Sequence, residues 1–218
     1  MSKKGSLNEM IASMEKSERR HFSLFATLQS GEKHYLKLFK AIASAYPDEP
    51  EYNDCADLAV TKNYLGKLIL KSLKNFSEGK TRHSQLLHLL LEIEILFQKE
   101  LFHLCLTKIK KGKGLAEKYE SYHLLLELIN WEKRVINTSA HPNKRSEIQS
   151  LVELEREILG IVNNLHEYNM LVEELMTSDF SDVNRMQEYL EHTLLDDESR
   201  AKCFGSLILF YHLKYILF

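Results

Sequence analysis

Backbone-breaking residues are scarce in this sequence, and that scarcity is the strongest constraint on its fold. The 218 residues include 8 glycines and 3 prolines, whereas the tight turns between short strands draw heavily on these two residue types. Hydrophobic residues make up 44% of the chain and the net charge is only −2, which excludes a disordered chain. The sequence therefore predicts an all-α protein built from long helices.

Capping residues and apolar spacing locate the first helices. Ser6 and Glu9 have the spacing of a capping box, so a first helix is expected to begin there. Ser17 is expected to cap a second helix, and a third is expected to run through Tyr35 and Ile42 until Pro47–Pro50 ends it.

A polar segment divides the chain. Residues 77–81 are polar and include Gly79, so they are expected to separate an amino-terminal helical subdomain, residues 1–78, from a region of stacked helical hairpins, residues 82–218. The helix expected from Arg82 to Phe97 is apolar on nearly every side. Such a helix should be covered by its neighbours on more than one face.

The second region should contain one very long helix. Residues 144–177 include no proline and a single glycine, Gly160, which predicts a continuous helix of about 34 residues. Its heptad positions alternate between apolar and polar, which favours packing on a globular neighbour over the alternative of a coiled coil. The other helices are expected at residues 100–119, 121–137, 182–193 and from 197 onwards.

A short motif recurs in the hairpin region. His88-Leu-Leu-Leu-Glu92 returns as His123-Leu-Leu-Leu-Glu127, an offset of 35 residues, and two helices per 35 residues is the period of helical-hairpin repeats. In this period and in its helix pairing, the region 82–218 resembles the tetratricopeptide-like α-solenoid class. The resemblance implies a short solenoid whose first helices line a concave surface that grips a peptide or a protein partner.

The repeated motif also supplies candidate binding residues. Histidine and glutamate four residues apart share a helix face, so two equivalent copies would form a polar ladder on one surface of the solenoid. The partner-binding residues expected on this basis are His88, Glu92, His123 and Glu127. The amino-terminal part resembles uncharacterised bacterial helical-repeat proteins, a likeness that implies no activity. It is carried by Ser17–Phe22, Tyr35–Phe39 and Lys62–Leu65.

Catalytic and cofactor-binding motifs are absent from the sequence. Gly-x-Ser-x-Gly and the phosphate-binding Gly-x-x-x-x-Gly-Lys-Ser/Thr do not occur, and the three cysteines lack the spacing of a zinc or redox site. We therefore expect a non-enzymatic protein–protein interaction module without a metal or cofactor. No apolar run follows the basic start, and no segment approaches the roughly 20 residues that span a bilayer, so we expect a cytoplasmic protein.

A transcriptional regulator is the alternative function. A short helix near 50–58, a turn at Leu58–Val60 and a helix opened by Thr61 follow the order of a degenerate helix-turn-helix at residues 51–76. Residues 1–118 carry 20 Lys and Arg against 14 Asp and Glu, whereas residues 119–218 carry 9 against 17. This asymmetry can mark a basic surface for nucleic acid. The nucleic-acid face would consist of Lys62, Lys67 and Lys71.

The carboxyl-terminal segment, Phe204–Phe218, is apolar and ends without a polar cap. Solenoids usually finish with a repeat whose outer face is polar, because an uncovered end is an exposed apolar patch. Either the chain continues beyond this segment or the segment packs on another copy. We expect self-association through the helix from about residue 197 to 218. The contacts would be Phe210, Leu213, Leu217 and Phe218.

Overall fold

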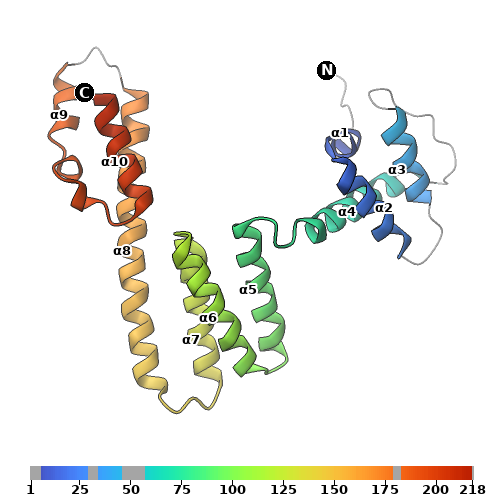
Figure 1. Cartoon of the computed structure of the whole chain (residues 1–218), viewed down its shortest axis with the longest axis horizontal. Helices are drawn as coiled ribbons and strands as arrows, with labels where there is room; N and C mark the ends of the chain where they lie inside the picture. Colours follow the sequence, from blue (N-terminus) through green and yellow to red (C-terminus); the bar gives the residue numbers. More distant parts are fainter. Residues whose placement is uncertain (1–5, 29–33, 46–56, 179–182, 218) are drawn as a thin grey trace. The chain divides into compact units, whose positions relative to one another are not determined.

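The computed structural model describes residues 6–28, 34–45, 57–178 and 183–217. Within these ranges all regular structure is helical and no β-strand occurs, so the protein is all-α, as the sequence predicts. The chain forms two compact units, Met1–Thr81 and Arg82–Phe218, and their helices are labelled in Figure 1. Among the described helices, none is long and apolar enough to cross a lipid bilayer.

The helices of the first unit share one apolar core. The rings of Phe22 and Phe39 lie 4.5 Å apart in this core, and the other large buried side chains around them come from every helix of the unit. The described helices are α1 (Ser6–Ser13), α2 (Lys16–Thr27), α3 (His34–Ala45) and α4 (Leu58–Ser77). The core also includes Ile11, Leu38, Ile42, Leu65 and Ile69.

The start of α2 is set by Glu15 rather than by Ser17. The carboxylate of Glu18 accepts a hydrogen bond from the backbone N–H of Glu15 at 2.8 Å, which completes a capping box one turn into the helix. Glutamate is not a preferred N-cap residue, so the sequence pattern favoured the serine. The loop predicted at Pro47–Pro50, after α3, lies outside the described residues.

The start of α4 contradicts the predicted helix-turn-helix turn. The carboxylate of Asp57 accepts hydrogen bonds from the backbone N–H groups of Ala59 at 3.0 Å and Val60 at 3.1 Å. Asp57 is therefore the N-cap and Leu58 the first helical residue. The turn predicted at Leu58–Val60 is wrong, because these residues form the first turn of α4. Most of the short helix predicted near residues 50–58 lies outside the described residues.

The second unit begins with three successive helices of equal length. They contain 17 residues each and begin 20 residues apart. The first packs on the second and the second on the third, and Figure 1 shows them side by side. They are α5 (Arg82–Gln98), α6 (Phe102–Lys118) and α7 (Tyr122–Thr138).

The two turns between these helices share one backbone conformation. Glu100 and Glu120 have positive φ angles of 58° and 51°. In both turns the next N–H donates to the carbonyl oxygen five residues earlier, at 3.0 and 2.9 Å, which is the Schellman motif. The helices begin 20 residues apart, whereas the two His-Leu-Leu-Leu-Glu copies are 35 residues apart, so the expected equivalence of the copies is wrong. His88 lies in the second turn of α5, whereas His123 lies in the first turn of α7.

α8 (Lys144–Thr177) is a single helix of 34 residues, as the sequence predicts. Its amino-terminal half packs on α7 through Leu151 and Ile158, and its carboxyl-terminal half packs on α10 (Phe204–Leu217). Figure 1 shows α10, in dark red, alongside the orange part of α8. Each half of α8 therefore has a globular neighbour, and the helix is not part of a coiled coil within the described chain.

The segment between α8 and α10 differs from the predicted helices. α9 spans Val183–Leu190, which is shorter than the helix predicted at 182–193. The last helix begins at Phe204 rather than near residue 197, because two short 3₁₀ turns precede it. These turns are Thr193–Leu195 and Glu198–Arg200.

Candidate functional site

α5 is apolar on two opposite sides, and one of them is open. Leu86, Leu89 and Ile93 are buried on the side that meets the core. The opposite side carries three apolar residues spaced four apart, which therefore form one stripe along the helix. Leu87, Leu91 and Ile95, called the α5 stripe below, are 46, 52 and 45% exposed. Within the second unit, the described helices therefore cover α5 on one side only, which contradicts the expectation of cover on more than one face.

Two of the predicted partner-binding residues, His88 and Glu92, lie on α5, and Glu92 forms an ion pair with α6. The carboxylate of Glu92 accepts a hydrogen bond from Nζ of Lys108 on α6 at 2.7 Å. His88 is half-buried one residue after Leu87. The ion pair is well exposed, so it contributes little stability, but it directs Glu92 toward α6.

His123 lies in a different place, at a pocket of about 450 Å³ beside the start of α7. Three exposed histidines from three helices line this pocket: His83 of α5, His123 of α7 and His166 of α8. Glu127, the fourth predicted residue, is exposed one turn further along α7. The predicted polar ladder is therefore wrong, because His123 shares a pocket with His83 and His166, whereas Glu92 is paired with Lys108. The rest of the lining is Glu120, Ser121, Tyr122, Leu124, Val162, Leu165 and Asn169.

The electrostatics of this histidine pocket depend on Glu120. Its two carboxylate oxygens accept hydrogen bonds from the backbone N–H groups of Phe204 and Gly205 at 2.8 and 3.1 Å. Burial, followed by the nearby charges of Glu120 and Cys203, raises the pKa of Tyr122 above its usual value. The Tyr122 hydroxyl therefore keeps its proton at neutral pH. The pocket lining combines these polar groups with the apolar side chains of Leu124, Val162 and Leu165, which suits binding of a polar group on an apolar body.

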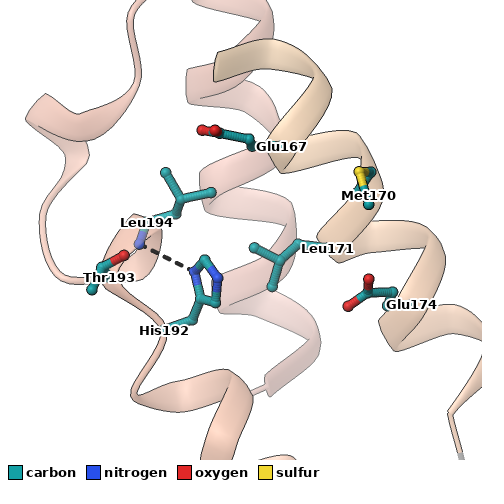
Figure 2. A pocket seen from close by; sticks show the side chains of 7 residues that line it. All are labelled: Glu167, Met170, Leu171, Glu174, His192, Thr193 and Leu194. Carbon is teal, nitrogen blue, oxygen red and sulfur yellow. Dashed lines mark hydrogen bonds between the residues drawn. The ribbon is translucent and has the colours of Figure 1, made fainter. Parts of the chain in front are cut away.

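A second pocket, of about 330 Å³, lies between α8 and the first 3₁₀ turn. Figure 2 shows Glu167 and Glu174 of α8 on one side and His192 on the other. The Nδ1 atom of His192 accepts a hydrogen bond from the backbone N–H of Leu194 at 3.2 Å, so in the neutral ring the proton lies on Nε2. Within the described residues, no group of three His, Cys, Asp or Glu side chains is placed to hold a metal ion.

The residues predicted for self-association are mostly inside the protein. Phe210 and Leu213 are 6 and 0% exposed, in the core that α10 shares with α8. Leu217 packs partly against the same core, and Phe218 lies outside the described residues. Phe210 and Leu213 are therefore wrong as contacts, because α10 is apolar all round and the side that faces α8 is the one that contains them.

The lysines of the alternative function lie on α4. Lys67 and Lys71 are exposed, and Lys62 is half-buried. Sequence reasoning missed the α5 stripe, although it recognised that α5 is apolar on every side. It also missed His83 and His166. The regular 20-residue spacing of His83, His103 and His123 was the available signal for the first of these.

Comparison of this chain with models of protein families, with curated proteins and with solved structures finds no match.

Proposed function

We propose that this protein is a non-enzymatic interaction module that binds a helix of a protein partner along the α5 stripe. The observation that carries the proposal is the open apolar side of α5. Helices that are apolar all round are normally buried. A contiguous patch of exposed apolar residues on a folded protein commonly marks an interaction surface. Leu87, Leu91 and Ile95 are each about half exposed, so a partner can reach them while α5 stays folded.

The chemistry of the stripe defines the partner. Its three side chains span about 12 Å along the helix axis, which matches two to three turns of an amphipathic helix laid against it. Glu94 is exposed about one turn from Leu91. A partner helix should therefore present an apolar stripe with a Lys or Arg at its rim, where the charge favours correct orientation more than affinity.

Site-specific photo-crosslinking tests this proposal. A photoreactive amino acid at position 91 should form a covalent adduct with a partner protein in a lysate, and the same residue at position 159 of α8 should not. Leu159 is the matched control because it is 51% exposed, against 52% for Leu91. The Leu91→Glu substitution should abolish capture of that same protein, and Leu159→Glu should leave it unchanged. Equal crosslinking from both positions, or capture that survives Leu91→Glu, would overturn the proposal.

Nucleic-acid binding by α4 is the second candidate function. It is favoured by the exposure of Lys67, Lys71 and Lys74 on one face of a 20-residue helix. Phosphate contacts release counterions, so the affinity should fall steeply with salt. Mobility shifts at two salt concentrations should detect binding that Lys67→Ala with Lys71→Ala removes and that Lys110→Ala with Lys111→Ala, on α6, retains. No shift at low salt would exclude this function.

A further inference from the structure

The outer side of α10 carries an exposed apolar stripe distinct from the one on α5. Its four residues are spaced by four, three and four positions, so they lie on one helix face. Phe204, Ile208, Tyr211 and Tyr215, called the α10 stripe below, are 66, 52, 53 and 84% exposed. Phe210 and Leu213, on the other side of α10, are buried against α8.

We propose that the α10 stripe is a homodimer interface, in which α10 of one copy packs antiparallel on α10 of a second copy. The spacing of the stripe is symmetric about its midpoint, between residues 209 and 210. A two-fold axis through that point places Phe204 of one copy opposite Tyr215 of the other, and Ile208 opposite Tyr211. Each contact then occurs twice, as an isologous interface requires.

The chemistry of the stripe suits this pairing. Aromatic residues stand at both ends, so the antiparallel arrangement forms two aromatic pairs, which gain more than their buried area alone provides. Tyr211, near the centre, donates a hydrogen bond to the carboxylate of Glu198. This bond orients the ring before association and reduces the entropy that the dimer would lose.

If all its exposed surface is buried, the stripe reaches the smallest area of a specific dimer. The exposed parts of its three aromatic side chains amount to roughly 400 Å² per copy, or about 800 Å² for the pair. Ile208 and the half-buried side chains beside it bring the total to about 1,000 Å², the lower bound for a specific interface. We therefore expect a dissociation constant in the micromolar range.

Charge on α10 does not oppose this dimer. Its only Lys, Arg, Asp or Glu side chain is Lys214, whose ammonium lies 5.8 Å from the centre of the Phe210 ring. An axis between residues 209 and 210 places the two copies of Lys214 toward opposite ends of the interface. The centre of the interface consequently contains no like charges from α10, which would otherwise cost several kcal/mol.

Light scattering coupled to size exclusion tests the dimer. At high micromolar concentration the protein should have twice the mass of the 25.5 kDa chain. Ile208→Glu should raise the dissociation constant at least about 10-fold, because it places a charge at the centre of the interface. Leu159→Glu, at an equally exposed position on α8, should leave the dimer intact. A monomer at all concentrations, or a dimer that tolerates Ile208→Glu, would overturn the proposal. Tyr215→Glu provides a second disruptive variant at the most exposed position if Ile208→Glu loses helicity.

Disulfide crosslinking tests the orientation. The three native cysteines are first replaced, Cys55→Ser, Cys105→Ala and Cys203→Ser. Phe204→Cys and Tyr215→Cys are then introduced into separate proteins. Under mild oxidation the mixture of the two should form a covalent dimer, and neither protein alone should do so efficiently. Crosslinking of Phe204→Cys with itself and no crosslinking in the mixture would indicate a parallel or different interface and overturn the antiparallel arrangement.

Discussion

The carboxylate of Glu120 accepts a hydrogen bond from the backbone N–H of Phe204, 84 residues further along the chain, at 2.8 Å. Its second oxygen accepts from the N–H of Gly205 at 3.1 Å. These are the first two residues of α10, so the carboxylate satisfies free N–H groups and interacts favourably with the positive end of the helix dipole. One side chain thus joins the α6–α7 turn to the start of the last helix.

The matched turn at Glu100 isolates the contribution of this cap. Both residues have positive φ, a conformation that costs a non-glycine residue energy, so Glu100→Gly should stabilise the protein by about 0.5–1 kcal/mol. Glu120→Gly relieves the same strain but loses the two bonds to α10, so it should be less stable than Glu100→Gly by about 1–2 kcal/mol. Urea unfolding followed by fluorescence of Trp131, the single tryptophan, reports on the second unit. Equal changes in the free energy of unfolding for the two variants would contradict a capping role for Glu120.

Asn164 fixes the chain just before α10 and should be sensitive to substitution. Its buried amide donates to the carbonyl of Arg200 at 3.1 Å and accepts from the N–H of Lys202 at 2.9 Å. Asn164→Leu preserves the volume but leaves both backbone groups without this partner, which should cost about 1–3 kcal/mol in urea unfolding. The neighbouring Asn163 is exposed, and Asn163→Leu should change stability by no more than about 0.5 kcal/mol. Similar losses for both variants would refute the specific role of Asn164.

Two glycines of α6 should respond oppositely to alanine. A Cβ on Gly114 would meet no atom within 4 Å, so Gly114→Ala should gain up to about 1 kcal/mol from helix propensity. A Cβ on Gly112 would lie 2.9 Å from Cδ2 of the buried Leu128 on α7. Gly112→Ala should therefore be about 1–3 kcal/mol less stable than Gly114→Ala, because the α6–α7 contact must open. Thermal unfolding of the two variants, followed by circular dichroism, measures this difference. Equal stabilisation would show that Leu128 can move to accept the added Cβ at no cost.

The long helices were predictable because their signal is extended along the sequence. Residues 144–177 lack proline and repeat apolar residues at helical spacing, and α8 has these bounds. Short-range features were less predictable. Glu15 and Asp57 are the N-caps of α2 and α4, whereas the sequence favoured Ser17 and Thr61, because several neighbouring residues could serve as caps and only the backbone path selects one.

The turns and the exposed stripes depended on tertiary structure. Glu100 and Glu120 adopt a conformation that glycine or asparagine usually occupies, so no turn residue marked these positions. In α10 the apolar residues surround the helix, and the sequence does not distinguish the buried Phe210 from the exposed Tyr211. Only the position of α8 decides which side is covered. The same ambiguity concealed the α5 stripe.

The stability of the protein at alkaline pH should depend on the hydroxyl of Tyr168. Its hydroxyl donates to the carbonyl of Leu194 at 2.8 Å. Burial raises the pKa of Tyr168 above its usual value of 10.0, Glu167 acts in the same direction and Arg200 opposes it. Because the pKa of Tyr168 is higher in the folded than in the unfolded chain, the stability that the protonated hydroxyl contributes is fully present below pH 10 and is lost as pH rises through the folded pKa.

Tyr168→Phe should lower the free energy of unfolding by about 1 kcal/mol at neutral pH. It should also make the decrease in stability above pH 10 shallower. Urea midpoints measured from neutral pH to about pH 11 test both effects, with Tyr215→Phe, at an 84% exposed position, as the control. An unchanged alkaline slope in Tyr168→Phe would show that this hydroxyl does not titrate with unfolding.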